Sequence, residues 1–219
     1  MIIILLICVL GILGIITAVV GTQGLWHSLI TFFNVMTAAL VATNYFEPIS
    51  EWFDYWGPTF TYLIDFVVVW GLFVGVLMVL RTLTDLVSRV KVRFIKPVDV
   101  AGGYLMAFWT AWVFICFAMM TMHTAALPRN YLGGSFQPEP DSKMLWAAPD
   151  QQWLALIHEL SKGSLAAYDT LPDKKGTRPR VFDPNGEFII RYAARRAEFE
   201  TKPGIRVRRE WGKSAENAE

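Results

Sequence analysis

The sequence predicts an all-α integral membrane protein in which four transmembrane helices are followed by a small, mostly helical extramembrane tail. Hydrophobic residues make up 54% of the 219 residues and charged residues only 18%, which is too apolar for an ordinary soluble domain. The charge is also uneven, because residues 1–127 hold 5 basic and 6 acidic side chains whereas residues 128–219 hold 15 and 13. The chain therefore divides into a membrane domain and a polar tail.

The first two spans are joined by a very short turn. Residues 2–20 are apolar without a break and no Lys or Arg precedes them. The run is also longer than the apolar core of a usual signal peptide, so we expect an uncleaved first span. Residues 21–24, Gly-Thr-Gln-Gly, form the turn. The second span covers about residues 25–43, and Asn34 near its middle is expected to make a hydrogen bond between helices.

An acidic and aromatic stretch separates the second span from the third. Residues 44–58 contain three acidic side chains, six aromatic ones and no basic one. From Pro48 onward the apolar residues recur at spacings of three and four. This spacing predicts a short helix lying flat in the interface on the outer side, with an aromatic ligand site as the alternative. The third span covers about residues 60–80 and contains Asp65.

The fourth span covers about residues 98–126 and fixes the orientation. The apolar run beyond Val98 contains a single charge, Asp99, and it exceeds the roughly 20 residues that cross a bilayer. Five basic residues precede it, whereas residues 44–58 contain none: Arg81, Arg89, Lys91, Arg93 and Lys96. Because basic residues beside a span resist translocation, we expect residues 81–97 on the cytoplasmic side. The amino terminus and the tail then lie on the opposite side.

Small residues recur one helical turn apart in all four spans. Such spacing lets helix backbones approach closely where no hydrophobic effect drives helices together. The pattern predicts a compact bundle, and self-association of the chain is a further use that it allows. The residues are Gly14 and Ala18, Ala38 and Ala42, Gly71 and Gly75, and Gly103, Ala107 and Ala111.

Two groups of residues in the membrane domain resemble a known family. The first is a short hairpin in which Gly24-Leu25 opens a span containing Ala38, Ala39 and Ala42, followed by the acidic aromatic loop. The second is Asp99 followed at four-residue steps by Gly103, Ala107 and Ala111. Over about residues 1–127 the sequence is similar to the colicin V production (CvpA) family of four-span bacterial inner-membrane proteins.

The resemblance implies an inner-membrane role in the export of a peptide toxin and in envelope maintenance. It also implies membrane or envelope proteins as partners, besides the lipid bilayer, but no agreed chemistry. The sequence departs from the family's pattern at several positions. Thr22, Gln23 and His27 stand where similar proteins usually carry basic residues, Ala107 and Ala111 stand where they tend to keep glycines, and Val100 stands where they tend to have a basic residue.

The first part of the tail is predicted to contain one helix and a linker. Pro128 ends the last span, because proline cannot easily continue a helix. Residues 149–162 are expected to form a helix with Trp153 and Ile157 on its apolar face. Residues 169–180 are polar and contain proline, so we expect a mobile linker there.

The second part of the tail, about residues 181–200, is predicted to form a hairpin followed by a helix. Asn185-Gly186 lies between two apolar runs, which is a hairpin-type turn signal. The residues after Ile190 favour a helix, on which three arginines cluster: Arg191, Arg195 and Arg196. The whole tail, about 90 residues long, is predicted to be a small accessory domain.

We expect no catalytic, cofactor-binding or metal-ligating group of residues. Cys8 and Cys116 lie inside apolar spans and fit no metal or disulfide spacing. His27 and His123 should lie at opposite ends of their spans, roughly 25–30 Å apart, so one haem cannot bind both. His158 is expected on the surface of the tail helix. The tail lacks a GDSGG-type nucleophile motif, and a net charge of +1 gives no argument for a nucleic-acid partner.

Two carboxylates are the candidate polar sites of the membrane domain. Asp99 is expected to cap the amino end of the fourth span, where a carboxylate satisfies free N–H groups and complements the helix dipole. Asp65 lies about 8 Å inside the third span, and an acid within a span is a functional candidate, although a structural role is favoured. His123 should lie at a similar depth. We expect Asp65 and His123 to pair, as a structural tie or as a proton-sensitive latch.

The favoured function is a non-enzymatic scaffold or accessory factor in toxin or peptide export and envelope maintenance. The alternative is a small transporter or channel subunit in which Asp65 and Asn34 line a polar path. A transporter needs a continuous polar face across several spans, and these spans contain few polar residues, which favours the scaffold. An enzyme is the third and least supported reading.

Overall fold

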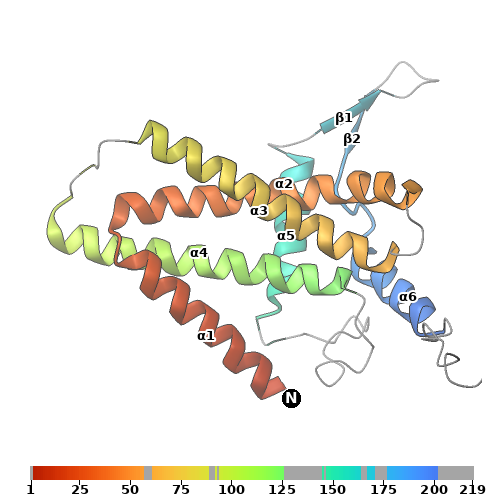
Figure 1. Ribbon diagram of the computed structural model, residues 1–219, viewed down its shortest axis with the longest axis horizontal. Coiled ribbons are helices and arrows are strands. Elements are labelled where there is room, and N and C mark those ends of the chain that lie inside the picture. Colours follow the sequence, from red (N-terminus) through yellow and green to blue (C-terminus); the bar gives the residue numbers. More distant parts are fainter. Residues whose placement is uncertain are drawn as a thin grey trace, which may run out of the picture.

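Four long helices form the membrane domain in the computed structural model (Figure 1). They are α1 (Ile2–Gly21), α2 (Leu25–Trp56), α3 (Thr61–Val87) and α4 (Lys96–Thr124). Each is long and apolar enough to cross a membrane, so the predicted all-α fold with four transmembrane helices is confirmed. The structure describes residues 2–56, 61–88, 92, 94–125, 145, 147–163, 167–170 and 177–201. The predicted helix end at Pro128 lies outside these residues.

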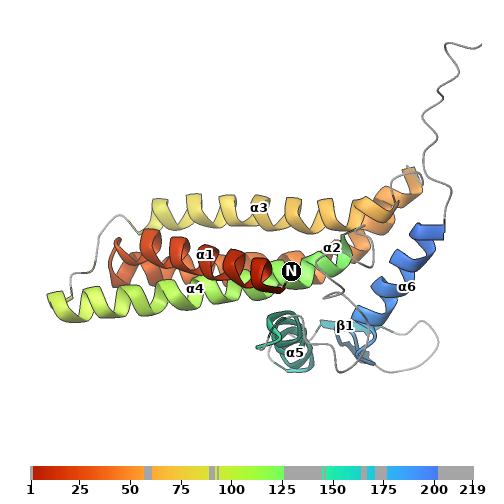
Figure 2. The same ribbon diagram turned by 90° about the horizontal axis from the view of Figure 1, so that it is seen from below.

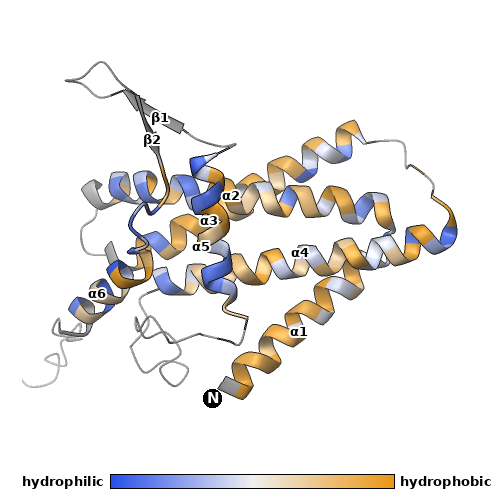
Figure 3. Cartoon of the chain, turned by 180° about the vertical axis from the view of Figure 1, so that it is seen from behind, coloured by the Kyte–Doolittle hydropathy of each residue, from blue (hydrophilic) through white to orange (hydrophobic). Residues whose placement is uncertain are grey.

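The four helices alternate in direction. One end of the bundle, which is named the inner end here, holds the turn between α1 and α2, the end of α3 and the start of α4, as Figures 1 and 2 show. The opposite end, which is named the outer end here, holds the end of α2, the start of α3 and the end of α4, whereas α1 begins short of it, at the level of α5. α1 is inclined to the other three helices in Figure 1. Figure 3 shows apolar residues along the spans, with hydrophilic residues at the end of α2, at the start of α4 and on α5.

α2 is one continuous helix of 32 residues, so the prediction of a separate helix beginning at Pro48 is wrong. At 1.5 Å per residue α2 is about 48 Å long, which exceeds the roughly 30 Å of a bilayer's hydrocarbon. Pro48 lacks the N–H that would bond to the preceding turn. The helix nevertheless continues, because its outer end packs against the tail: Phe46 is completely buried and Ser50 is 4% exposed.

The segment between the third and fourth spans is more helical than predicted. α3 continues to Val87 and α4 begins at Lys96, so Arg81 and Asp85 lie on α3 rather than in a loop. Their side chains are 3.9 Å apart across one helical turn and both are exposed. The spans therefore extend into the basic region that the sequence assigned to the cytoplasmic loop.

The tail adds two helices and one small sheet to the bundle. These are α5 (Pro149–Lys162), α6 (Phe188–Thr201) and the antiparallel strands β1 (Ala167–Thr170) and β2 (Thr177–Arg180). α5 has the bounds predicted for the tail helix. Figures 1 and 2 show that α5 lies across the spans rather than along them. The expected linker at residues 169–180 is wrong at both ends, because β1 and β2 pair there through backbone hydrogen bonds.

The predicted hairpin at Asn185-Gly186 is also wrong. This turn leads into α6 instead of joining two strands. The carboxylate of Asp183 accepts hydrogen bonds from the backbone N–H groups of Glu187, at 2.8 Å, and Phe188, at 2.9 Å. Asp183 therefore caps the amino end of α6, as short polar side chains commonly do. The turn signal was real, but a capped helix follows it rather than a second strand.

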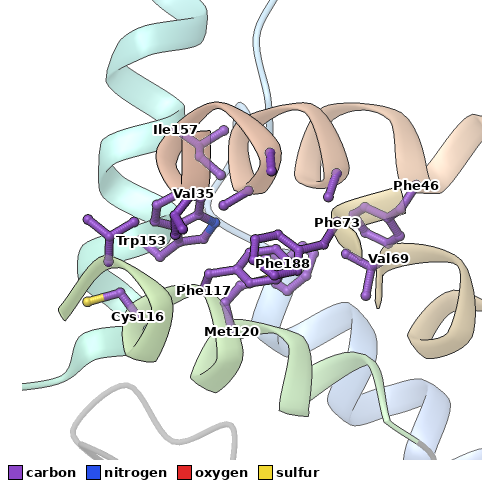
Figure 4. Close-up of a cluster of buried hydrophobic side chains, with 14 of the residues drawn as sticks. Val35, Phe46, Val69, Phe73, Cys116, Phe117, Met120, Trp153, Ile157 and Phe188 are labelled. Carbon is purple, nitrogen blue, oxygen red and sulfur yellow. The ribbon is translucent and has the colours of Figure 1, made fainter. Parts of the chain in front are cut away.

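Spans and tail share one hydrophobic core, which Figure 4 shows in close-up. Trp153 of α5 is 1% exposed and its ring lies 5.9 Å from the ring of Phe117 in α4. Phe188 of α6 is equally buried and packs edge-on against Phe46 of α2. The described part of the tail is thus an extension of the membrane domain's core rather than a separate accessory domain.

The small residues of two spans lie in close helix packing, whereas those of the other two do not. The side chains of Ala107 and Ala111 in α4 are completely buried, as are Ala38 and Ala42 in α2. The prediction that Gly71 and Gly75 pack against a neighbouring span is wrong within this chain. Both face outward, and a Cβ atom built on either would meet nothing within 4 Å. Gly14 and Ala18 of α1 are exposed as well.

Candidate functional site

Asp99 joins two helices at the inner end of the bundle. Its Oδ1 accepts a hydrogen bond from the backbone N–H of Leu25, the first residue of α2, at 2.9 Å. The cap position of Asp99's own helix is Ile95, which makes no side-chain cap bond. The prediction that Asp99 caps the fourth span is therefore wrong: it caps the second. An N–H group of α2 that has no partner within the helix is satisfied by α4 instead.

Glycines allow the turn between α1 and α2 to lie directly on α4. Gly24 has a φ of +85°, a conformation that other residues adopt at a cost. A Cβ on Gly103 would lie 3.1 Å from the carbonyl oxygen of Gly21 and 3.2 Å from the backbone nitrogen of Leu25. Asp99 and Gly103 are four residues apart and lie on one face of α4. The first provides a hydrogen-bond acceptor, and the second has no side chain and so lets the backbone of the turn approach.

Two further hydrogen bonds tie α2 to α3 at the same end. Asn34 Nδ2 donates to Thr84 Oγ1 at 3.0 Å, an interhelical bond of the kind predicted for Asn34. Trp26 Nε1 donates to Ser88 Oγ at 2.9 Å. Asn34 is 6% exposed, so its amide serves as a bond between helices within the bundle.

At the outer end, α6 brings arginines onto two acidic residues of the spans. Arg195 forms an ion pair with Asp65 of α3, and Arg191 forms one with Glu47 of α2. The two arginines are four residues apart and therefore lie on one face of α6. Asp65 is 3% exposed, and a carboxylate this buried needs a compensating charge. The tail supplies that charge.

A second buried contact joins α4 to α5. His123 in the last turn of α4 lies with its Nε2 2.9 Å from Oδ2 of Asp150 in the first turn of α5. His123 is 2% exposed and Asp150 is 3% exposed. Arg196 of α6 donates from Nη1 to the backbone carbonyl oxygen of His123 at 2.8 Å. A cation at the carboxyl end of α4 also complements the helix dipole.

The predicted Asp65–His123 pair is replaced by two bonds to the tail. Both residues lie buried at the outer end of the bundle, as the depth argument required. Asp65 is bonded to Arg195 and His123 to Asp150. Arg195 and Arg196 are adjacent in sequence, so α6 connects the two sites through consecutive residues. The predicted pair is wrong because both residues bond to the tail, which docks onto the outer ends of the spans.

Tyr192 lies between the two α6 arginines and shares their surroundings. The guanidinium carbon of Arg191 is 5.5 Å from the Tyr192 ring centre and that of Arg195 is 6.0 Å away. Burial raises the pKa of the Tyr192 phenol, and the nearby carboxylates of Asp65 and Glu47 raise it further. The phenol is therefore held in its neutral form far into the alkaline range.

The sequence indicates which residues of this site are candidates but not which residues pair with one another. The sequence shows the arginine cluster of α6, and an acid within an apolar run, such as Asp65, indicates that a polar partner is needed. Asp150 gave no signal, since an acidic residue in the first turn of a helix is usual. His158, expected on the surface, is half-buried, and its Nδ1 lies 3.0 Å from the carbonyl oxygen of Phe182.

The described residues hold together by hydrogen bonds and ion pairs and offer no metal site. Among them, no three His, Cys, Asp or Glu side chains gather as metal ligands would. Cys116 is buried in α4 and Cys8 is exposed on α1. The polar contacts of this site thus attach the tail to the spans, because side chains of α5 and α6 bond to the outer ends of α2, α3 and α4.

Four apolar helices, joined by buried polar contacts, define a multi-pass membrane protein. A family model described as "Colicin V production protein" matches residues 2–137, which is more than half of the chain. The chain therefore belongs to the colicin V production protein family. The match covers all four spans and includes the Gly24, Asp99 and Gly103 positions that meet at the inner end. No curated protein and no solved structure matches the chain.

Proposed function

We propose that this protein is a non-enzymatic scaffold or accessory factor of the bacterial inner membrane, acting in peptide-toxin export and in envelope maintenance. Membership of the family supports the link to toxin production. The observation that supports a scaffold is that the polar side chains of the spans bond to other helices of the protein. Asp99, Asn34, Asp65 and His123 each bond to a neighbouring helix, which holds spans and tail as one body.

The transporter alternative is less well supported. Asn34 bonds to Thr84 toward the inner end, whereas Asp65 bonds to Arg195 at the outer end. Between these levels the core is apolar and aromatic, with the rings of Phe73 and Phe117 stacked 4.8 Å apart. A polar path through the bundle would have to pass this core.

The proposed orientation places the tail and the amino terminus outside the cytoplasm. The end of the bundle that carries Arg81 and Lys96 is rich in basic residues, and the stretch between the second and third spans is acidic, as the rule for cytoplasmic segments requires. In a chain whose exposed Cys8 is replaced by Ala, a thiol probe should react with Val92→Cys only from the cytoplasm. It should react with Ala194→Cys on α6 only from outside. The reverse pattern would overturn the orientation.

Toxin release tests the proposed function. A strain that carries colicin V genes but lacks this protein should release less active toxin into the medium, and the wild-type gene should restore release. Unchanged release would overturn the role in export. As a control for the transporter alternative, the purified protein in lipid vesicles should conduct no ions. A flux that Asp65→Asn abolishes would favour the transporter instead.

A further inference from the structure

Positive charge is concentrated at the inner end of the bundle, where α3 is connected to α4. Residues 86–98 contain four basic residues and no acidic one, whereas residues 1–80 contain no basic residue. Lys96, the first residue of α4, is exposed. Arg81 and Asp85, which precede this segment, contact each other on α3 and balance in charge. A partner of this end of the protein should therefore be anionic.

Apolar side chains are exposed in the same segment. Val87, the last residue of α3, is 86% exposed, and Ile95, just before α4, is 76% exposed. Ile95 has an extended backbone, with φ −61° and ψ 133°. Figure 3 shows hydrophobic and hydrophilic residues side by side at the start of α4. Apolar side chains so exposed are unfavourable in water, so the partner should offer an apolar layer besides negative charge. The described residues that combine the two properties are named the inner surface segment: Val87, Val92, Phe94, Ile95 and Lys96.

Hydrogen bonds to the start of α2 place both ends of this segment at the level where α1 ends. Ser88, directly after α3, accepts from Trp26 Nε1 in the first turn of α2 at 2.9 Å. Asp99, in the first turn of α4, accepts from the N–H of Leu25, which follows the last residue of α1, Gly21, by four positions. α1 has 20 residues and no charged side chain, and it is about 30 Å long, the thickness of the hydrocarbon. Its end therefore marks the inner limit of the hydrocarbon, and the inner surface segment begins and ends near that limit.

A bilayer surface with anionic headgroups meets both requirements at this depth. The headgroups match the basic charge, and the acyl chains beneath them can accommodate exposed apolar side chains. A soluble acidic partner would match the charge as well, but it would have to enter the bilayer surface to cover Val87 and Ile95. Basic residues clustered directly beside a transmembrane helix are typical of segments that bind anionic lipid.

We propose that the inner surface segment binds anionic phospholipid headgroups of the bilayer. Lys96, together with the basic charge of the residues that precede it, attracts the headgroups, and the exposed side chains of Val87 and Ile95 enter the upper acyl layer. Glu51 is exposed at the outer end of α2, where its charge repels anionic lipid, so the preference is confined to the inner end. This binding goes beyond toxin export and does not depend on it.

Quenching by two lipids that differ only in their headgroup tests this proposal. In a Cys8→Ala background, which keeps the buried Cys116, a fluorophore is attached at Val92→Cys. A matched label at Tyr45→Cys is exposed toward the outer end of α2, beside acidic residues. Both proteins are reconstituted in phosphatidylcholine vesicles. Phosphatidylglycerol or phosphatidylcholine, each with the same nitroxide on its acyl chain close to the headgroup, is then added at increasing mole fraction.

The label at Val92 should favour nitroxide phosphatidylglycerol by more than about fivefold, which is the effect expected of a single basic side chain at the headgroups. Lys96→Gln should reduce this preference about fivefold, whereas Lys96→Arg should retain it. Both variants change an exposed side chain, so the fold should be unaffected. High salt should lower the preference by screening the charges. The label at Tyr45 should show no preference for phosphatidylglycerol.

Equal quenching of the Val92 label by the two lipids would overturn the proposal. If soluble polyglutamate then shifted the emission of this label, the segment would be assigned to an acidic protein partner instead. An equal preference for phosphatidylglycerol at Val92 and Tyr45 would also overturn the proposal, because the anionic lipid would then not distinguish the inner end from the outer end.

Discussion

The imidazole Nε2 of His123 lies 2.9 Å from Oδ2 of Asp150, and both side chains are almost completely buried. The two residues are 27 positions apart, at the end of α4 and the start of α5. This contact therefore fixes the tail to the membrane domain by a bond independent of the chain that connects them. Arg196 strengthens the junction by bonding to the carbonyl oxygen of His123.

Removing the Asp150 carboxylate should destabilise the protein. Asp150→Ala deletes the acceptor of a buried hydrogen bond to His123, which should lower the free energy of unfolding by about 1–3 kcal/mol. Denaturant unfolding in detergent micelles measures this change. Asp85→Ala is the matched control, because Asp85 makes only an exposed contact with Arg81 and should cost under ~1 kcal/mol. Equal losses for the two variants would contradict the account.

The Asp65–Arg195 ion pair should show energetic coupling. In a double-mutant cycle, Asp65→Asn and Arg195→Gln should couple by about 0.5–3 kcal/mol, because the two groups contact each other and Asp65 is buried. Glu47→Gln with Arg191→Gln provides the comparison. Those side chains are 35% and 56% exposed, so their coupling should be smaller, about 0–1 kcal/mol. A cycle that gives zero for Asp65 and Arg195 would show that α6 is not docked there.

Alkaline pH should weaken the docking of α6 through Tyr192. Burial and two carboxylates raise the pKa of its phenol above the ordinary value of 10.0. Below about pH 10 the phenol is neutral in both folded and unfolded states, and its contribution is fully present. Above pH 10 the unfolded state loses the proton first, so stability should fall by about 1.4 kcal/mol per pH unit until the folded phenol also ionises.

Tyr192→Phe removes this dependence and provides the control. Unfolding is followed from pH 9 to pH 11 for both proteins. Other titrating groups affect both alike, so the wild type should lose more stability than the variant over this range. Parallel curves would contradict the buried position of Tyr192 beside Asp65 and Glu47.

Small residues should be essential for packing in α4 but not at the outward-facing positions of α3. Ala107→Leu should destabilise the bundle by about 1–3 kcal/mol, because Ala107 is completely buried and a larger side chain would overpack its neighbours. Gly71→Leu should change stability by less than about 0.5 kcal/mol in monomeric protein, because Gly71 faces outward. Thermal unfolding in detergent compares them. A large loss at Gly71 would place a packing partner on that face of α3.

The spans were predictable because length and hydrophobicity alone decide whether a helix crosses a membrane. Asn34 was predictable for a related reason, since a polar amide among apolar helices bonds to a neighbouring helix. The role of Asp99 was not. Its position near a helix start suggests a cap for its own helix, and only the fold shows that its carboxylate accepts from the N–H of Leu25 in another helix.

The docking of the tail lay beyond what sequence patterns reveal. Apolar spacing predicted which face of α5 is buried, but Trp153 gave no indication that its site lies between α2 and α4. The four-residue spacing of Arg191 and Arg195 likewise indicated a shared helix face without naming Glu47 and Asp65. Such contacts join residues more than 100 positions apart, which local periodicity does not encode.

The central claim is that the tail is part of the membrane domain's core, and hydrogen exchange tests it most directly. In lipid nanodiscs, backbone amides of α5 should exchange as slowly as those in the outer half of α2, because Trp153 is buried between α2 and α4 and bonds to Thr43. Trp153→Ala should speed exchange in both segments together. Rapid exchange throughout α5, with α2 to α4 still protected, would contradict the claim and show that the tail is an independent appendage.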